Sequence, residues 1–281
     1  AAGTDPGGVR YAFLGGPGGT SYSVELYRHA WSEPQPIVST TLADLRVVRQ
    51  RDSGALIVHG IDPSGGLVAA LGGPDGTFQV TTALAVLGEK PVFDLAEVAL
   101  VATDAGWTWF AVAGASTGMP GQLLSAAGAP GRTQLDFAPV YAAASELATL
   151  VALPWAQEPG TAGVLALDTS GGVHLALVGA DGGAADVVGT LSGGALQAPV
   201  ATIAPVLHAD TGAPPQPRIY AVAPASGEQD ALWVLRLVDP GLPLTDPAAW
   251  SSWIPVGGAY PAPAGGPPLQ ATDALFSTAG D

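Results

Sequence analysis

The chain contains an internal repeat of about 50 residues, and this repeat constrains the fold more than any other feature. Each copy starts with a small residue and an acidic residue and continues as an apolar run, as in TTLADLRVVRQ, FDLAEVALVAT and AAASELATLVA. Two looser copies follow, LQAPVATIAPV and LQATDALFSTA. The marker residues of the copies are Asp44, Glu97, Glu146, Pro199 and Asp273. A period of this length indicates one supersecondary unit that is copied along the chain.

Each repeat contains four short β-type runs that are separated by turn residues. In the second repeat the runs are LRVVRQ, ALIVHGI, LVAALGG and TFQVTTALAV, with Asp-Ser-Gly, Asp-Pro-Ser-Gly-Gly and Pro-Asp-Gly between them. Gly supplies the positive φ that tight turns need, and Asp and Pro favour the neighbouring bends. The runs are largely apolar, as expected for strands that are buried on both faces. No stretch carries a convincing helical stripe.

The two ends of the chain each supply part of one further unit. The N-terminal region offers three runs, VRYAFLG, SYSVELYRHA and PIVSTT, and the C-terminal region offers one, ALFSTAG. Together they make a four-stranded sheet, which would close a ring and leave no long unpaired inner edge. The sequence therefore predicts an all-β fold: a five-bladed β-propeller with four-stranded blades, in which the C-terminal strand completes the N-terminal blade.

We expect residues 1–281 to form one domain, because closed all-β folds reach this length as single units. The alternative is a β-sandwich or a two-domain all-β protein, in which short strands recur without a longer period. The expected blades are residues 9–42 with 273–280, 44–92, 97–141, 146–194 and 199–258.

The charge of the chain excludes some partners. Acidic residues outnumber basic ones 24 to 9, and the formal net charge is -15. Such a charge repels phosphate backbones and anionic lipids, and the apolar stretches are far shorter than the roughly 20 residues of a membrane helix. We therefore expect no nucleic-acid partner and no membrane insertion. The chain begins Ala1-Ala2-Gly3, as is typical after cleavage of a signal peptide, and we expect a secreted or surface-displayed protein.

Four of the five repeats place a carboxylate just before their first strand, at Asp44, Glu97, Glu146 and Asp273. The topology predicts that these acids ring one mouth of the central channel, where they could bind Ca²⁺ or act as an acid and base pair. The five-bladed glycosidase families place three carboxylates at this kind of location, and the chain resembles them in topology alone. The other interpretation is structural, with each acid accepting hydrogen bonds from turn amides.

No resident cofactor or metal is expected from the remaining residues. The chain has no cysteine, so it has no disulfide framework and no thiolate metal site. The four histidines show no spacing typical of metal ligands; they are His29, His59, His174 and His208.

Tryptophans form the second candidate group. Trp233 lies in DALWVLRL, and Trp250 and Trp253 lie in PAAWSSWIPVGG. This segment resembles the repeat of β-propeller lectins, in which a strand Asp-Gly-x-Leu-Trp is followed by Trp-Ser-x-Trp and a Gly-Gly turn. The resemblance is confined to the fifth blade and implies rings that stack on sugar faces. Trp109 ends a single DxGxTW sequence, which is similar to the Asp-box turn of sialidase-type propellers. The alternative is that these rings fill gaps between blades.

These features favour a non-catalytic propeller that recognises a glycan or a protein through loops at one mouth. Two alternatives stay open: a glycoside hydrolase or lyase that uses the carboxylates at the channel, and a structural propeller module of a larger assembly. The candidate ligand-binding residues are Trp233, Trp250, Trp253, Trp109, Asp44, Glu97, Glu146 and Asp273.

Overall fold

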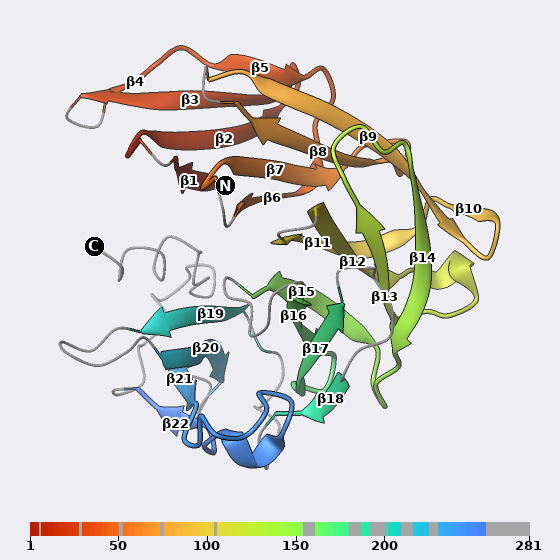
Figure 1. The fold of residues 1–281 in the computed structure, drawn as a ribbon, viewed down its shortest axis with the longest axis vertical. Coiled ribbons are helices and arrows are strands. Elements are labelled where there is room, and N and C mark those ends of the chain that lie inside the picture. The colour runs from red at the N-terminus through yellow and green to blue at the C-terminus, as the bar shows by residue number, and fades with distance from the viewer. Residues whose placement is uncertain are drawn as a thin grey trace.

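The residues that the structure describes form five successive antiparallel meanders (Figure 1). We number them one to five in chain order. The structure is a computed structural model, and it describes residues 1–5, 7–27, 30–50, 53–73, 76–103, 106–153, 161–179, 187–191, 200, 202–208, 216–224 and 230–256. The predicted all-β fold is confirmed. No helix among these residues has the length and apolar character that a membrane span requires.

The strands of each meander follow one another along the chain. Meander one contains β1 (Ala2–Thr4), β2 (Arg10–Gly16), β3 (Gly19–Tyr27), β4 (Ala30–Trp31) and β5 (Gln35–Val38). Meander two contains β6 (Ala43–Arg49), β7 (Leu56–Ile61), β8 (Leu67–Gly72) and β9 (Phe78–Leu87), with β10 (Lys90–Val92) attached to β9. Meander three contains β11 (Leu95–Thr103), β12 (Gly106–Ala113), the 3-10 turn η1 (Ala115–Thr117), β13 (Leu123–Gly128) and β14 (Gln134–Tyr141).

The last two meanders have the same order. Meander four contains β15 (Leu147–Ala152), β16 (Thr161–Asp168), β17 (Val173–Gly179) and β18 (Val187–Thr190). Meander five contains β19 (Thr202–His208), β20 (Gln216–Pro224), β21 (Asp230–Arg236), the 3-10 turn η2 (Pro247–Ala249) and β22 (Ile254–Pro255).

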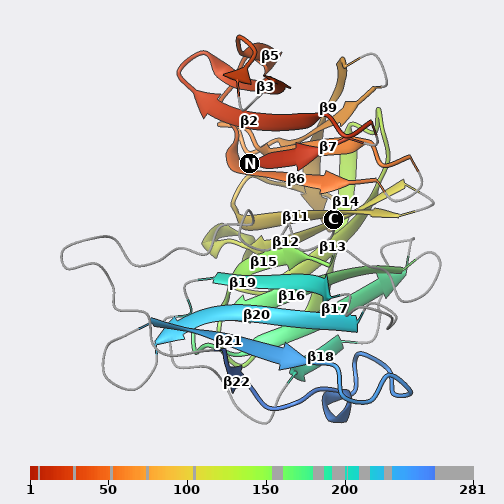
Figure 2. The same cartoon turned by 90° about the vertical axis from the view of Figure 1, so that its left-hand side faces the viewer.

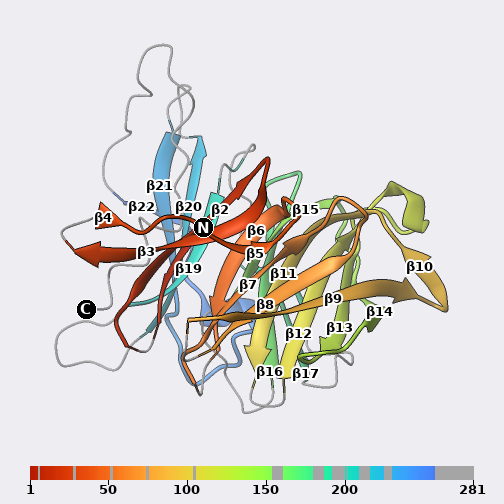
Figure 3. The same ribbon diagram turned by 90° about the horizontal axis from the view of Figure 1, so that it is seen from above.

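The meanders are arranged around a common centre, with the first strand of each innermost (Figure 1). Contacts run from β1 to β6, from β6 to β11, from β11 to β15 and from β15 to β19. Figure 2 shows the meanders following one another from β2 to β22, and Figure 3 shows β10 on the side opposite β21 and β22. The first strands therefore bring residues from different repeats to one axis.

Four apolar cores hold the meanders together, one between each successive pair. The cores contain Phe13 and Val58 (meanders one and two), Leu100 and Trp109 (two and three), Phe110 and Leu150 (three and four), and Leu165 and Ile219 (four and five), all 2% exposed or less. The middle strands β7, β12 and β16 are buried along almost their whole length. The sequences of these strands are continuous apolar runs without alternation, because neither face of such a strand meets solvent.

The N-terminal meander differs from the prediction. Its region was expected to supply three strands, and it supplies a further inner strand, β1, which pairs with β2 in the register Ala2↔Ala12 and Gly3↔Tyr11. The segment Ala-Gly-Thr is too short and too small to give a strand pattern in the sequence. The predicted closing strand, residues 274–280, lies outside the described residues.

Meanders two and three are joined into one nine-stranded sheet, which the repeat did not predict. Strand β9 is ten residues long; its first part pairs with β8, and its last part pairs in parallel with β14, from Gln134↔Leu84 to Phe137↔Leu87. This pairing satisfies backbone groups of the outer strands that would otherwise be an exposed sheet edge.

Candidate functional site

The marker acids lie where the first strands begin, and a bulge displaces each of these strands. Pairing with the second strand shifts between Ala43 and Arg46 in β6, between Leu95 and Glu97 in β11, and between Leu147 and Thr149 in β15. Each bulge re-aims the side chains beside it. Arg46, Glu97 and Thr149 are therefore the equivalent residues of their strands, since each is the first paired residue after the bulge.

The marker acids are consequently not equivalent in structure, although the sequence repeat aligns them. Asp44 lies inside the bulge of β6 with a φ of 50°, a left-handed conformation that Asp adopts more readily than most residues. Glu97 follows the bulge of β11, and Glu146 precedes β15. Asp273, the fourth acid, lies outside the described residues.

Arg46 connects three first strands at the axis. Its Nε donates to Asp44 Oδ1 at 2.6 Å, and its Nη2 donates to Glu97 Oε2 in β11. Its Nη1 donates to the main-chain carbonyl of Leu150 in β15. The three side chains are 18% to 24% exposed. We call Asp44, Arg46 and Glu97 the axial ion cluster.

The two carboxylates of the axial ion cluster also bind the backbone of the next meander. Val98 N in β11 donates to Asp44 Oδ2 at 3.0 Å, and Leu150 N in β15 donates to Glu97 Oε2 at 3.4 Å. Each acid therefore joins its own first strand to the following one. The structural interpretation predicted that these acids accept hydrogen bonds from backbone amides of turns. They do accept from backbone amides, but these amides belong to strands.

Burial raises the pKa of Glu97 above its usual value, and the Asp44 charge adds to the rise. The Arg46 guanidinium and the Leu150 N–H lower it, but they do not cancel the rise. A carboxyl with a raised pKa is the kind of group that can act as a general acid. Here that group is already bound to a cation and to a backbone amide.

Glu146 makes no side-chain hydrogen bond within the described residues, and its side chain is exposed. Its main-chain carbonyl accepts from Thr169 N at 2.9 Å, and Leu147 N donates to Gly121 O at 3.1 Å. Gly121 has a φ of +69°, and a Cβ there would lie 2.6 Å from Glu146 Cβ. Glu146 thus lies in a tight contact between meanders three and four. Of the marker acids that the structure describes, Asp44 and Glu97 alone share a binding partner, Arg46.

The calcium hypothesis finds no cluster among the described residues. No three Asp, Glu, His or Cys side chains of this part of the chain lie close enough together to hold a metal ion. Between Asp44 and Glu97 the positive charge is supplied by Arg46.

Turn capping is performed by acids other than the markers. Asp62 and Asp168 each begin an Asp-x-Ser-Gly-Gly turn, and the Oδ1 of each accepts from the backbone of the following Ser and of the second Gly. Burial would raise the pKa of Asp168, but hydrogen bonds from Ser170, His174 and Gly172 hold it below its usual value. Its Oδ2 lies 2.8 Å from His174 Nε2, and His174 Nδ1 lies 3.1 Å from the Tyr141 hydroxyl.

Trp109 is a core residue between meanders two and three. It is 2% exposed, and its ring meets the His59 ring in a T-shaped contact with a centroid separation of 5.6 Å. A Cβ at Gly128 would lie 3.0 Å from Trp109 Cδ1, so the glycine makes room for the ring. Trp109 presents no ring face to solvent.

The three tryptophans of meander five pack on one core, the core between meanders four and five. Trp250 is 6% exposed, and its Nε1 donates to Leu244 O at 2.8 Å, so its polar atom is satisfied inside the protein. Trp233 and Trp253 are half-buried at the margin of this core. Trp233 pairs across the sheet with Pro255 of β22, and Trp253 is the residue directly before β22.

Sequence reasoning missed Arg46, which binds three first strands, and the buried His59 beside it. They are cross-strand partners in β6 and β7. His59 is 1% exposed, and burial, assisted by the Arg46 charge, lowers its pKa to about 3. Neither ring nitrogen of His59 has a hydrogen-bond partner within the described part of the chain. The signal in the sequence that could have identified them is a charged residue and a histidine within strands that are otherwise apolar.

No model of a known protein family matches the sequence, and no curated protein matches it closely. Among solved structures, the chain is similar to BP39L lectin from Burkholderia pseudomallei, with a TM-score of 0.53, 16% identity and coverage of 92% of this chain and 70% of that one. It is also similar to a triple arginine-to-alanine mutant of AofleA from Arthrobotrys oligospora, with a TM-score of 0.51, 9% identity and coverage of 89% and 68%. Both are β-propellers, and the likeness indicates a β-propeller fold for the present chain.

Proposed function

We propose that this chain is a β-propeller that binds a glycan beside Trp233 and Trp253 and catalyses no reaction. The observation that carries the proposal is the position of these two rings, which are both half-buried in meander five and both packed against the apolar core between meanders four and five. Partly exposed aromatic rings on a rigid base offer a flat apolar face to the C–H groups of a sugar. The fold shared with a lectin is consistent with this proposal.

The axial ion cluster supports the non-catalytic part of the proposal. The carboxylate oxygens of Asp44 and Glu97 accept hydrogen bonds from Arg46 and from backbone amides of the next first strand. A nucleophile or base must be able to reach a substrate, and these bonds compete with that role. We include in the proposal that the ring has five blades within one domain and that the protein acts outside the cell or at its surface.

Replacing Trp253 with alanine is expected to weaken glycan binding at least tenfold, because the stacking face is removed, while the protein stays folded. The glycan is first found by screening labelled protein on a glycan array, and its Kd is then measured by calorimetry. Trp31→Ala is the control, because Trp31 is 44% exposed and lies in β4 of meander one; its Kd should equal that of the parent.

Trp250 does not serve for this test. It is buried with its N–H bound to Leu244 O, so its truncation would cost about 3 kcal/mol or more of stability. Unchanged glycan binding by Trp253→Ala would contradict the proposal. An array without any hit, together with a protein recovered in a pull-down, would point to the protein-binding version or to a module of a larger assembly.

A second candidate function is glycoside hydrolysis at the axis, and one observation favours it. Glu97 has a pKa above its usual value, and Glu97 and Asp44 both form an ion pair with the guanidinium of Arg46. Two neighbouring carboxyl groups, one of them with a raised pKa, are the groups that glycosidases use. Release of reducing sugar from an oligosaccharide panel, abolished in Glu97→Gln and retained in Glu146→Gln, would establish this function. A parent protein that releases no sugar from the panel would exclude these substrates.

A further inference from the structure

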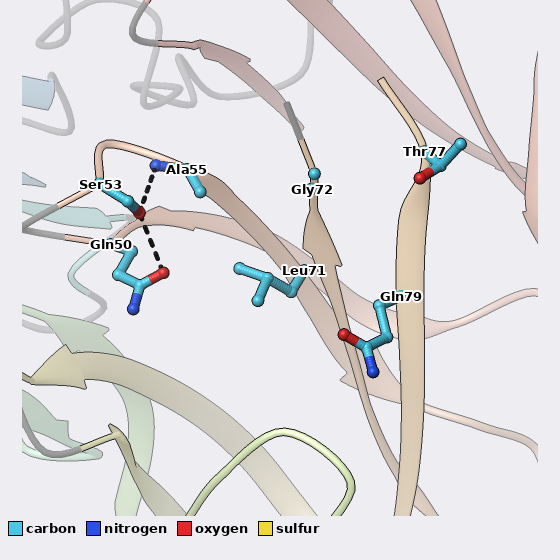
Figure 4. A pocket seen from close by; sticks show the side chains of 8 residues that line it. Gln50, Ser53, Ala55, Leu71, Gly72, Thr77 and Gln79 are labelled. Carbon is cyan, nitrogen blue, oxygen red and sulfur yellow. Dashed lines mark hydrogen bonds between the residues drawn. The ribbon is translucent and has the colours of Figure 1, made fainter. Parts of the chain in front are cut away.

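A pocket of about 410 Å³ lies at one end of meander two, between the β6–β7 turn and the β8–β9 turn (Figure 4). This volume is within the range of roughly 300–1,000 Å³ that small-molecule sites occupy. Two glycines and six side chains line the pocket, namely Gln50, Ser53, Ala55, Leu71, Thr77 and Gln79.

This pocket is separate from both sites described above. Asp44 lies near the start of β6, where Ala43 pairs with Ile61 of β7. Gln50 follows the other end of β6, where its N–H donates to Ala55 O at 2.8 Å. The pocket and the axial ion cluster therefore lie at opposite ends of meander two, and Trp233 and Trp253 belong to meander five.

A short hydrogen-bond chain fixes the carboxamide of Gln50. Ser53 Oγ accepts from Ala55 N at 3.1 Å and donates to Gln50 Oε1 at 3.0 Å. Figure 4 shows both bonds, with the amide nitrogen of Gln50 directed away from Ser53. Within the described residues this nitrogen donates no hydrogen bond, so its two N–H groups are available to a ligand.

Gln79 supplies a second carboxamide on the opposite side of the pocket. It lies in β9 across from Leu71 of β8, and its side chain is exposed. Its amide makes no hydrogen bond within the part of the chain that the structure describes. Leu71 and Ala55 add an apolar surface between the two amides (Figure 4).

We propose that this pocket is a second binding site and that its ligand is a neutral sugar residue. The polar side chains of the described lining are carboxamides and hydroxyls. Two carboxamides provide four N–H donors and, at Gln79, a free acceptor, which match hydroxyl groups that both donate and accept. The apolar surface matches the C–H face of a pyranose ring. This site is independent of the one beside Trp233 and Trp253.

The test follows the side-chain amide signals of Gln50 and Gln79 by NMR during titration of the ¹⁵N-labelled protein. The probes are the methyl glycosides of glucose, galactose, mannose and fucose, with methyl glucuronide as the charged counterpart. At least one neutral glycoside should shift both signals, and methyl glucuronide should bind at least fivefold more weakly. The double variant Gln50→Leu/Gln79→Leu should lose the binding, measured by saturation-transfer NMR.

Three controls make the outcome specific. Gln79→Glu keeps the size of the side chain and adds a charge, and it should weaken the neutral probe without a change in Tm. Gln35→Leu, at an exposed position of β5, should leave the binding unchanged. Trp253→Ala should also leave the pocket signals unchanged, so the two sites can fail separately. Absence of shifts with every neutral glycoside, or equal binding by the double Leu variant, would overturn the proposal.

Discussion

Replacement of Arg46 with methionine is expected to lower the free energy of unfolding by about 3 kcal/mol at pH 7, since it leaves two partly buried carboxylates without their cation. Arg46 is bonded to Asp44, Glu97 and the Leu150 carbonyl, so its loss affects three first strands together. Denaturant unfolding followed by tryptophan fluorescence measures the change.

The pH dependence of this loss has a defined sign. Glu97 already has a raised pKa, and Arg46 is the largest of the influences that lower it; the methionine variant raises it further. A carboxyl whose pKa is higher in the folded state than in the unfolded state favours folding as the pH falls. The difference between parent and Arg46→Met should therefore be largest at neutral pH and smaller near pH 5.

Two comparisons separate the charge effect from lost packing. Adding Asp44→Asn and Glu97→Gln to the methionine variant removes the unpaired charges and should recover most of the stability. Arg132→Met removes an exposed ion pair with Asp136 in which both side chains are about half exposed, and it should cost under about 0.5 kcal/mol. An Arg46→Met protein as stable as the parent would show that the axial ion cluster contributes nothing to holding the first strands.

Replacement of His59 with leucine is expected to make the protein more resistant to acid. The unfolded chain binds a proton at His59 below about pH 6.5, whereas in the folded protein the pKa is lowered to about 3. Between these values the unfolded state holds more protons, so the parent loses stability as the pH falls. The contribution of His59 to that loss is about 3 kcal/mol between pH 7 and pH 4.

The carboxyl groups titrate over the same range, so the informative quantity is the difference between the two proteins. At pH 7 the leucine variant should lie within about 1 kcal/mol of the parent, because the buried ring nitrogens have no hydrogen bond within the described residues to lose. At pH 4 the variant should be the more stable protein. Parallel stability curves for the two proteins from pH 7 to pH 4 would refute the assignment.

The repeat predicted the meanders because the signals that define them are local. A strand such as β7 or β12 is buried on both faces and therefore reads as an apolar run, and the intervening turns require Gly or Asp. The inner strand β1 escaped prediction because Ala2–Thr4 carries no such run. The β9–β14 joint escaped it because parallel pairing depends on where two distant strands lie in space.

The surroundings of the candidate residues could not be predicted from the sequence, because they depend on side-chain direction. A bulge moves Asp44 and Glu97 out of equivalent positions, and a repeat in the sequence cannot reveal a bulge. Tryptophans look alike in a sequence, yet Trp109 is in a core while Trp253 is at the margin of one. What surrounds a ring is decided by the packing of neighbouring meanders.

The parallel joint between β9 and β14 has a consequence for the order in which the protein folds during synthesis. When the ribosome has released residue 141, all nine strands of the joined sheet are present, together with the core between meanders two and three. A nascent chain of that length can complete this sheet before meanders four and five exist. Meanders four and five would then pack onto a sheet that is already folded, so the repeats would fold in the order in which they are synthesised.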